Sequence, residues 1–142
     1  MNKKLMQAQD LERLFNEVRR LGIYQHDKYE LSDADITLLF SVSFGPEEGI
    51  KPSLIAKRQN VTLPAITHKM NKLVYDGYLR RRESTSDKRV SYVLLTEKGK
   101  TFVESIKNDY YSKMLIIMDH LGERDSKTLL RILKKINTIK EI

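Results

Sequence analysis

A segment near the middle of the chain, Thr62–Leu73, has the strongest local signals for structure. Thr62 can cap a helix because its hydroxyl can accept a hydrogen bond from an unpaired amide of the first turn, and Pro64 is tolerated at an early helical position. Apolar residues recur at spacings of three and four, which is typical of an amphipathic helix. They are Leu63, Ile66, Met70, Leu73 and Val74. The opposite side carries Thr67, His68, Asn71, Lys72 and Tyr75. We therefore expect one face in a core and the other free to bind.

The neighbouring segments predict how this helix is built into a larger unit. A shorter helix is expected directly before it, over Ser53–Arg58, and the link Gln59-Asn60-Val61 fits the tight joint of a helix-turn-helix. Asp76-Gly77 should end the longer helix, because glycine readily adopts the left-handed conformation of a C-terminal cap. Two strands rich in aromatic and branched residues follow, over 78–83 and 90–95. This order of elements predicts a winged helix-turn-helix.

Positive charge is concentrated in the same part of the chain. Residues 51–100 contain 12 Lys/Arg and 4 Asp/Glu, whereas the remainder contains 14 and 15, for a total net charge of +7. The cations of the predicted hairpin are Arg80, Arg81, Arg82, Lys88 and Arg89. A local basic patch beside a helix-turn-helix is typical of proteins that bind duplex DNA, because neutralised phosphates release counterions.

Further helices are predicted on both sides of this unit. Ser32 and Asp35 resemble a capping box, and the helix they begin should bury one side. That side comprises Ile36, Leu39, Phe40 and Ser43. The N-terminal residues 3–21 form an amphipathic pattern, and a helix of about six turns is expected over 97–121. Gly122 should end that long helix, and a last helix should be capped by Asp125 or Ser126.

The apolar stripes of the terminal helices exceed what a compact winged domain needs to cover itself. We therefore predict one domain over 1–142 that is mainly α-helical with a small β-hairpin wing, in which 32–95 form the winged helix-turn-helix. Residues 1–30 and 97–142 should form the dimerisation helices of a homodimer. Two-fold symmetry would place two DNA-reading helices about 34 Å apart, on a pseudo-palindromic operator in double-stranded DNA.

Composition excludes several other classes of protein. The chain has no cysteine, which excludes disulfides and cysteine-ligated zinc, and its three histidines are far apart and in no ligand motif. No apolar run approaches the roughly 20 residues that span a bilayer, so we expect no membrane association and a cytoplasmic protein. We find no nucleophile elbow, no phosphate-cradling glycine loop and no carboxylate dyad. The chain is therefore predicted to have no cofactor, no metal and no enzymatic activity.

Several motifs together resemble those of the MarR family of transcriptional regulators. They are Leu54-Ile-Ala, Val61-Thr-Leu-Pro-Ala-Ile-Thr-His68, Gly77-Tyr-Leu-Arg-Arg-Arg82, Asp87-Lys-Arg89 and Val93-Leu-Leu-Thr-Glu-Lys-Gly99. The most specific are the Asp-x-Arg of the wing and the Leu-Thr-x-x-Gly entry into the next helix. The resemblance covers nearly the whole chain and implies a homodimer that binds operator DNA, commonly as a repressor relieved by a small ligand.

The resemblance also implies which residues contact DNA. Major-groove contacts fall on Pro64, Ala65, Thr67 and His68. Arg89 would enter the minor groove, whose negative potential attracts arginine, and Asp87 would brace it. The full predicted set of DNA-binding residues is Thr62, Pro64, Ala65, Thr67, His68, Lys72, Arg82, Asp87, Lys88 and Arg89. Leu63 and Lys69 depart from the family pattern, so the side chains that reach bases depend on the rotation of this helix.

The residues also permit less specific interpretations. Thr67 and His68 could be ordinary solvent-facing side chains, and strand alternation prevents three consecutive arginines from all facing DNA. A set of tyrosines could line an effector pocket or simply cover junctions between elements: Tyr24, Tyr29, Tyr78, Tyr110 and Tyr111. The alternative function is a winged-helix protein used for non-specific nucleic-acid binding or protein assembly. The sequence identifies neither the operator, nor an effector, nor whether binding represses or activates transcription.

Overall fold

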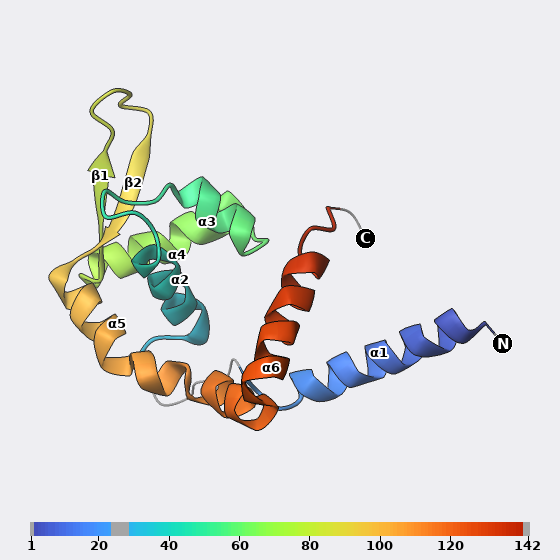
Figure 1. Ribbon diagram of the computed structural model, residues 1–142. Coiled ribbons are helices and arrows are strands. Elements are labelled where there is room, and N and C mark those ends of the chain that lie inside the picture. The colour runs from blue at the N-terminus through green and yellow to red at the C-terminus, as the bar shows by residue number, and fades with distance from the viewer. Residues whose placement is uncertain (1, 24–28, 141–142) are drawn as a thin grey trace. The chain divides into compact units, whose positions relative to one another are not determined.

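The computed structural model describes residues 2–23 and 29–140. These residues are mainly helical and include a two-stranded antiparallel sheet, which confirms the predicted fold class (Figure 1). The elements are α1 (Lys3–Arg19), α2 (Asp33–Ser43), α3 (Pro52–Arg58), α4 (Leu63–Tyr75), β1 (Leu79–Glu83), β2 (Ser91–Leu95), α5 (Glu97–Tyr110) and α6 (Ser112–Ile136). Two compact units are distinguished, one of Met1–Ile23 with Asn108–Ile142 and one of Tyr24–Lys107. Tyr24, considered above for an effector pocket, lies outside the described residues.

The core of the second unit contains α2. Its N-terminus is capped as predicted, because the Ser32 hydroxyl accepts a hydrogen bond from the Asp35 amide at 3.2 Å. Its buried apolar residues are Ile36, Leu38, Leu39, Phe40 and Val42. The predicted single stripe was incomplete, since it omitted Leu38 and Val42. A helix that is apolar around most of its circumference is a central helix of a core, and α2 has this character.

The helix-turn-helix consists of α3, a tight turn and α4. Asn60 in the turn has a φ of 53°, a left-handed conformation that asparagine tolerates better than most residues, and the Val61 amide donates to the Ala56 carbonyl at 3.0 Å. Thr62 caps α4 as predicted, because its hydroxyl accepts from the Ala65 amide at 3.2 Å. Gly77, with a φ of 86°, follows the C-terminal end of the helix. The local signals in the sequence therefore define both ends of α4.

The buried face of α4 consists of Ile66, Met70 and Leu73, while Val74 is half-buried. The prediction that Leu63 belongs to the core was wrong, because this residue is 47% exposed. All residues from Val61 to Ala65 are exposed, so the first turn of α4 projects past the core and the packed part begins at Ile66.

The wing is the hairpin formed by β1 and β2, and its strands project beyond the helices of their unit (Figure 1). Leu79 pairs with Leu95 and Glu83 with Ser91, within one residue of the predicted strand ends. The outer edge of β2 is also bonded at Val93, which exchanges hydrogen bonds of 3.1 and 2.9 Å with Ile50. The base of the wing is therefore attached to the loop that precedes α3.

The junction between the wing and α5 explains the Leu-Thr-x-x-Gly motif. The Thr96 hydroxyl donates to the Gly77 carbonyl and accepts from the Gly99 amide, and the Thr96 amide donates to the Tyr78 carbonyl. Gly99 lies against that carbonyl so closely that an added Cβ atom would be 2.2 Å from the Tyr78 oxygen. The motif thus closes the end of α4 onto the start of α5.

The two long C-terminal helices differ from the prediction in two respects. The helix expected over 97–121 ends at Tyr110, although the sequence there contains neither glycine nor proline. Gly122 interrupts α6 with a φ of 79° and a ψ of 172°, as predicted. The prediction that Asp125 or Ser126 caps a new helix was wrong, because helical residues resume directly after Gly122. The Ser126 hydroxyl instead donates across the kink to the Met118 carbonyl at 3.2 Å.

Both long terminal helices present apolar side chains to solvent. Helix α1 has no buried residue, and Leu11, Leu14, Phe15 and Val18 are each about half exposed. Helix α6 similarly exposes Leu129, Leu130, Ile132, Leu133 and Ile136. None of the helices in the described part of the chain is both long enough and apolar enough to cross a membrane.

Candidate nucleic-acid interface

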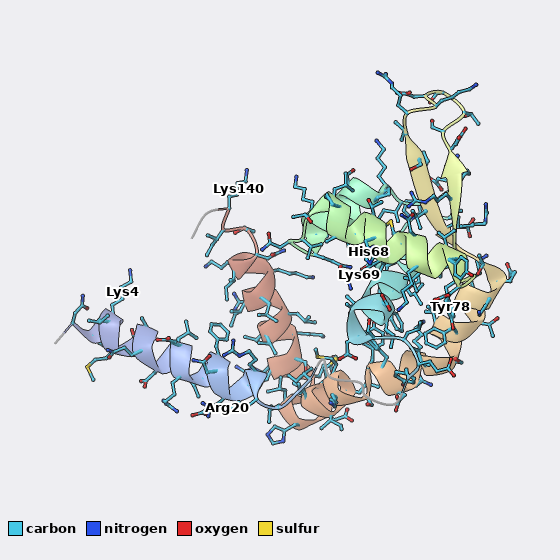
Figure 2. All side chains as sticks on the ribbon, turned by 180° about the vertical axis from the view of Figure 1, so that it is seen from behind. Lys4, Arg20, His68, Lys69, Tyr78 and Lys140 are labelled. Atoms are coloured by element: carbon cyan, nitrogen blue, oxygen red, sulfur yellow. The ribbon has the colours of Figure 1, made fainter. Side chains whose placement is uncertain are left out.

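The exposed face of α4 is a row of side chains along the whole helix. Pro64, His68, Asn71 and Tyr75 are all exposed and recur at helical spacing, and Tyr75 reaches 92% exposure. His68 and Lys69 are labelled on this helix in Figure 2. Thr67 and Lys69 are half-buried at the flanks of the row. The predicted contacts Thr62, Pro64, Ala65 and His68 are therefore accessible in or next to the first two turns.

A groove of about 380 Å³ runs between the start of α3, the start of α4 and the wing. It is lined by Lys51, Pro52, Ser53, Leu63, Thr67, Arg81, Arg89, Val90 and Ser91. Three of these residues are cationic and none is acidic, so the groove carries a concentrated positive charge. We call Lys51, Arg81 and Arg89 the basic groove residues. Such a surface suits the phosphates of nucleic acid.

The three consecutive arginines of β1 are divided between the two sides of the strand. Arg81 faces α4, where its guanidinium donates to the Asn71 side-chain oxygen at 2.7 Å. Arg82 lies on the other side, where it donates to the Glu48 carbonyl at 2.9 Å and stacks 4.6 Å from the centre of the Tyr92 ring. Arg80 lines a separate cleft of about 490 Å³ with acidic and basic side chains. Of the three arginines of β1, the one that borders the groove is thus Arg81, which was not in the predicted set.

The tip of the wing is organised by Asp87 and Arg89. The Asp87 carboxylate accepts from the Arg89 backbone amide at 3.0 Å and from its guanidinium at 3.1 and 3.2 Å. The side-chain hydrogen bond from Arg89, followed by the backbone hydrogen bond, lowers the pKa of the Asp87 carboxyl below its ordinary value. The Arg89 side chain is still 91% exposed, and neighbouring Lys88 is also exposed. The pair therefore orients a cation that remains available to a ligand.

Lys72, another predicted contact, is engaged within the protein. Its ammonium donates to the Asp35 carboxylate at 3.2 Å, and the Asp35 side chain is only 4% exposed whereas that of Lys72 is 58% exposed. This ion pair joins α2 to α4 across 37 positions of the chain.

The structure offers limited support for other ligands. Within the described ranges, no three histidine and carboxylate side chains are grouped so that they could hold a metal ion. Tyr29 and Tyr78 both pack edge-on against Phe102, with ring centres 6.4 and 5.5 Å away, and Tyr110 packs in the same way against Tyr111 at 5.0 Å. These contacts account for the tyrosines as packing residues, and an effector pocket among them stays a prediction.

Eight of the ten predicted contacts thus lie in two places, the start of α4 and the tip of the wing, whereas Lys72 and Arg82 contact other parts of the protein. The prediction missed Arg81, Lys51 and Ser53, which line the groove between these places. Strand alternation implied that Arg81 faces away from its two neighbours, but identifying the side that faces α4 required the pairing of Arg81 with Asn71.

Known proteins resemble this chain in sequence and in fold. A family model described as transcriptional regulator SarA/Rot matches residues 21–106. The HTH-type transcriptional repressor YetL of Bacillus subtilis (strain 168) is 29% identical over 103 residues, which are 72% of this chain and 62% of YetL. The chain therefore spans less than two thirds of the length of that relative.

Two solved structures illustrate the similarity in fold. AbsC, a MarR family transcriptional regulator from Streptomyces coelicolor, superimposes with a TM-score of 0.78 at 18% identity, covering 96% of this chain and 94% of AbsC. MepR of S. aureus, in a complex with DNA, gives a TM-score of 0.72 at 15% identity, covering 97% and 98%. The predicted MarR-type winged-helix fold is confirmed.

Proposed function

Because the chain belongs to the SarA/Rot family of transcriptional regulators, which are not enzymes, we propose that it regulates transcription by binding duplex DNA through α4 and the wing. The observation that carries this proposal is the basic groove beside the exposed row of α4. Lys51, Arg81 and Arg89 line it without any acidic residue, and the row that includes His68 is free of apolar packing. MepR, which shares this fold, was solved in a complex with DNA, and this supports DNA binding by the chain.

The proposed contacts follow from the chemistry of each surface. The first three turns of α4 enter the major groove, where His68 and Asn71 can hydrogen-bond base edges and Pro64 and Ala65 make apolar contacts. Arg89, braced by Asp87, enters the minor groove. Lys51 and Arg81 contact phosphates at the rim, together with Lys88 at the wing tip. Thr62 acts through the cap of α4, and Thr67 lines the groove.

We propose that the functional unit is a homodimer. The exposed apolar side chains of α1 and α6 favour burial against a second copy, as large apolar patches on isolated chains mark interfaces. A two-fold dimer would bind a pseudo-palindromic operator. The name of YetL supports repression as the outcome, and release by a small ligand is proposed from the resemblance to the MarR family alone. A cytoplasmic location is part of the same proposal.

Selection of bound fragments from genomic DNA at near-physiological salt tests the proposal. An enriched inverted repeat is expected, and it would supply the operator for measurements on variants. Uniform recovery would contradict sequence-specific binding and favour the alternative, non-specific nucleic-acid binding, since only the electrostatic part of the affinity would remain.

Two variants of β1 test the surface that we assign. Arg81→Ala should weaken operator binding by about 1–3 kcal/mol and reduce the salt dependence by about one ion. Arg80→Ala is the matched control, because it removes the same charge from the neighbouring position on the other side of the strand and should change the affinity much less. Equal effects of the two variants would show that only net charge matters and that the groove is not the binding surface.

A further inference from the structure

Asp35 is unusual because it is a charged side chain in the core. Among the described residues, it and Ser126 are the buried side chains that are polar or charged. An ionised carboxylate is costly to bury unless a cation and hydrogen bonds compensate it. Asp35 is also fixed in place, since its amide donates to the Ser32 hydroxyl in the first turn of α2. Such a carboxylate needs a specific partner.

That partner is Lys72 of α4, whose ammonium lies 3.2 Å from the carboxylate. Lys72 follows Asn71 directly and lies one turn after His68, at the flank of the exposed row that faces α2. The Lys72 side chain is long and its position is exposed, so the ammonium could turn to solvent. The buried charge of Asp35 holds it against α2 instead.

Asn71, which belongs to the exposed row itself, makes a second polar attachment. The Asn71 side chain accepts a hydrogen bond of 2.7 Å from Arg81 of β1. Two consecutive residues of α4 are therefore bound to different elements, Asn71 to the wing and Lys72 to α2. Adjacent helical positions differ by about 100° around the axis, since a turn contains 3.6 residues. Two attachments in different directions oppose rotation of the helix about its axis.

We propose that Asp35 is a positioning residue that fixes the rotation of α4 and withholds Lys72 from DNA phosphates. Through Lys72, the carboxylate determines that the row containing His68 and Asn71 faces the DNA. This inference rests on the proposed function, because rotation of α4 affects specificity only if the helix reads bases. It assigns Lys72, predicted as a DNA contact, to an ion pair within the protein instead.

The salt dependence of binding to a mixed-sequence duplex shows whether Lys72 pairs with Asp35 or contacts a DNA phosphate. Asp35→Asn should release the ammonium, add one phosphate contact and steepen the salt dependence by about 0.9 ions. The loss of affinity between 50 and 200 mM salt should then be about 3.5-fold greater than for the wild type. Lys72→Met, which keeps the aliphatic stem, should leave the slope unchanged. A flatter slope for Lys72→Met, or an unchanged slope for Asp35→Asn, would overturn the proposal.

The ratio of operator affinity to mixed-sequence affinity tests the positioning role. Asp35→Asn and Lys72→Met should each reduce this ratio at least tenfold. A variant that is merely less stable has a smaller active fraction, which lowers both affinities equally and leaves the ratio unchanged. Lys127→Met is the control, since it removes an exposed lysine paired to Glu123 at 3.0 Å on α6 and should preserve both ratio and slope. An unchanged ratio for Asp35→Asn would refute the positioning role.

A third measurement requires no DNA and separates failure of the inference from failure of the proposed function. Lys72→Met leaves a buried carboxylate unpaired, so it should lower the thermal midpoint, and the double variant Asp35→Asn with Lys72→Met should recover most of that loss. Recovery without any DNA binding by the wild type would mean that the ion pair is correct and the proposed function is wrong. A double variant no more stable than Lys72→Met would overturn the attachment of α4 to α2.

Discussion

Replacing Gly99 by alanine should destabilise the junction between the wing and α5. The new methyl group would lie 2.2 Å from the Tyr78 carbonyl oxygen, whereas real Cβ contacts are essentially never shorter than 3.0 Å. The new Cβ atom and the Tyr78 carbonyl oxygen would therefore have to move apart by at least 0.8 Å. The obstacle is backbone, which cannot move aside as a flexible side chain could.

The size of the effect follows from the bonds that meet at this point. A shift of this size would weaken the hydrogen bond of 3.1 Å from the Thr96 amide to the Tyr78 carbonyl, worth about 1 kcal/mol. It would also disturb the Thr96 cap on the Gly99 amide, worth about 1 kcal/mol. Overpacking adds about 1–3 kcal/mol, and the better helix propensity of alanine offsets about 1 kcal/mol. The net loss of unfolding free energy should be about 2–4 kcal/mol.

Urea unfolding at a fixed protein concentration measures this loss, with amide hydrogen exchange at Thr96 as a local probe. Gly77→Ala is the matched control at the same junction. The φ of Gly77, 86°, is unfavourable for alanine. The nearest atom to a Cβ added there is Lys98 Cδ at 3.7 Å, so only conformational strain of about 1–2 kcal/mol is expected. If Gly99→Ala costs no more than Gly77→Ala, or leaves Thr96 exchange unchanged, the close approach at Gly99 is not what requires glycine.

Three further predictions concern the wing and the terminal helices. The Asp87 carboxyl should titrate below its ordinary pKa of 3.8 in a carbon-detected NMR titration, and Arg89→Ala should return its pKa to that value. Because a lowered pKa stabilises the ionised form, the Asp87–Arg89 pair should persist from pH 7 to pH 5. It should be lost only as the pH falls through the folded-state pKa. Arg82→Ala should lower the unfolding free energy by about 1–2 kcal/mol through its contacts with Tyr92 and the backbone, yet change DNA affinity less than Arg81→Ala does, and a larger loss of affinity would assign Arg82 to the interface. Phe15→Glu should shift light-scattering mass from dimer towards monomer, and an unchanged mass would exclude this face of α1 from the dimer interface.

The elements with local signals were predictable from the sequence. The Thr62 cap, the left-handed Gly77 and the hairpin strands each depend on residues within a few positions of one another, and their boundaries agree with the structure to within about one residue. Helical periodicity also placed Ile66, Met70 and Leu73 in the core. Such signals carry information because capping, turn chemistry and side-chain periodicity act over one or two turns.

The remaining features depend on what each element packs against. Leu63 continues the apolar stripe of α4, but the core ends before the first turn and leaves it exposed. Leu38 and Val42 lie off the predicted stripe of α2, yet they are buried because other elements surround that helix. The partner of Lys72 lies 37 positions away, and no local pattern identifies it. Contacts between distant segments decide these cases, and they cannot be read from a single segment.

The pairing of the sheet gives the arginine run of β1 another consequence. In the described part of the chain β2 is bonded on one side to β1 and on the other, at Val93, to Ile50, so β1 is the outer strand. An outer strand has unpaired peptide groups to which a strand of another molecule can add, the first step in many aggregation reactions. Arg80, Arg81 and Arg82 occupy the middle of this strand. Two such strands brought together would repel each other, so the charge on this strand opposes aggregation through the edge of the sheet.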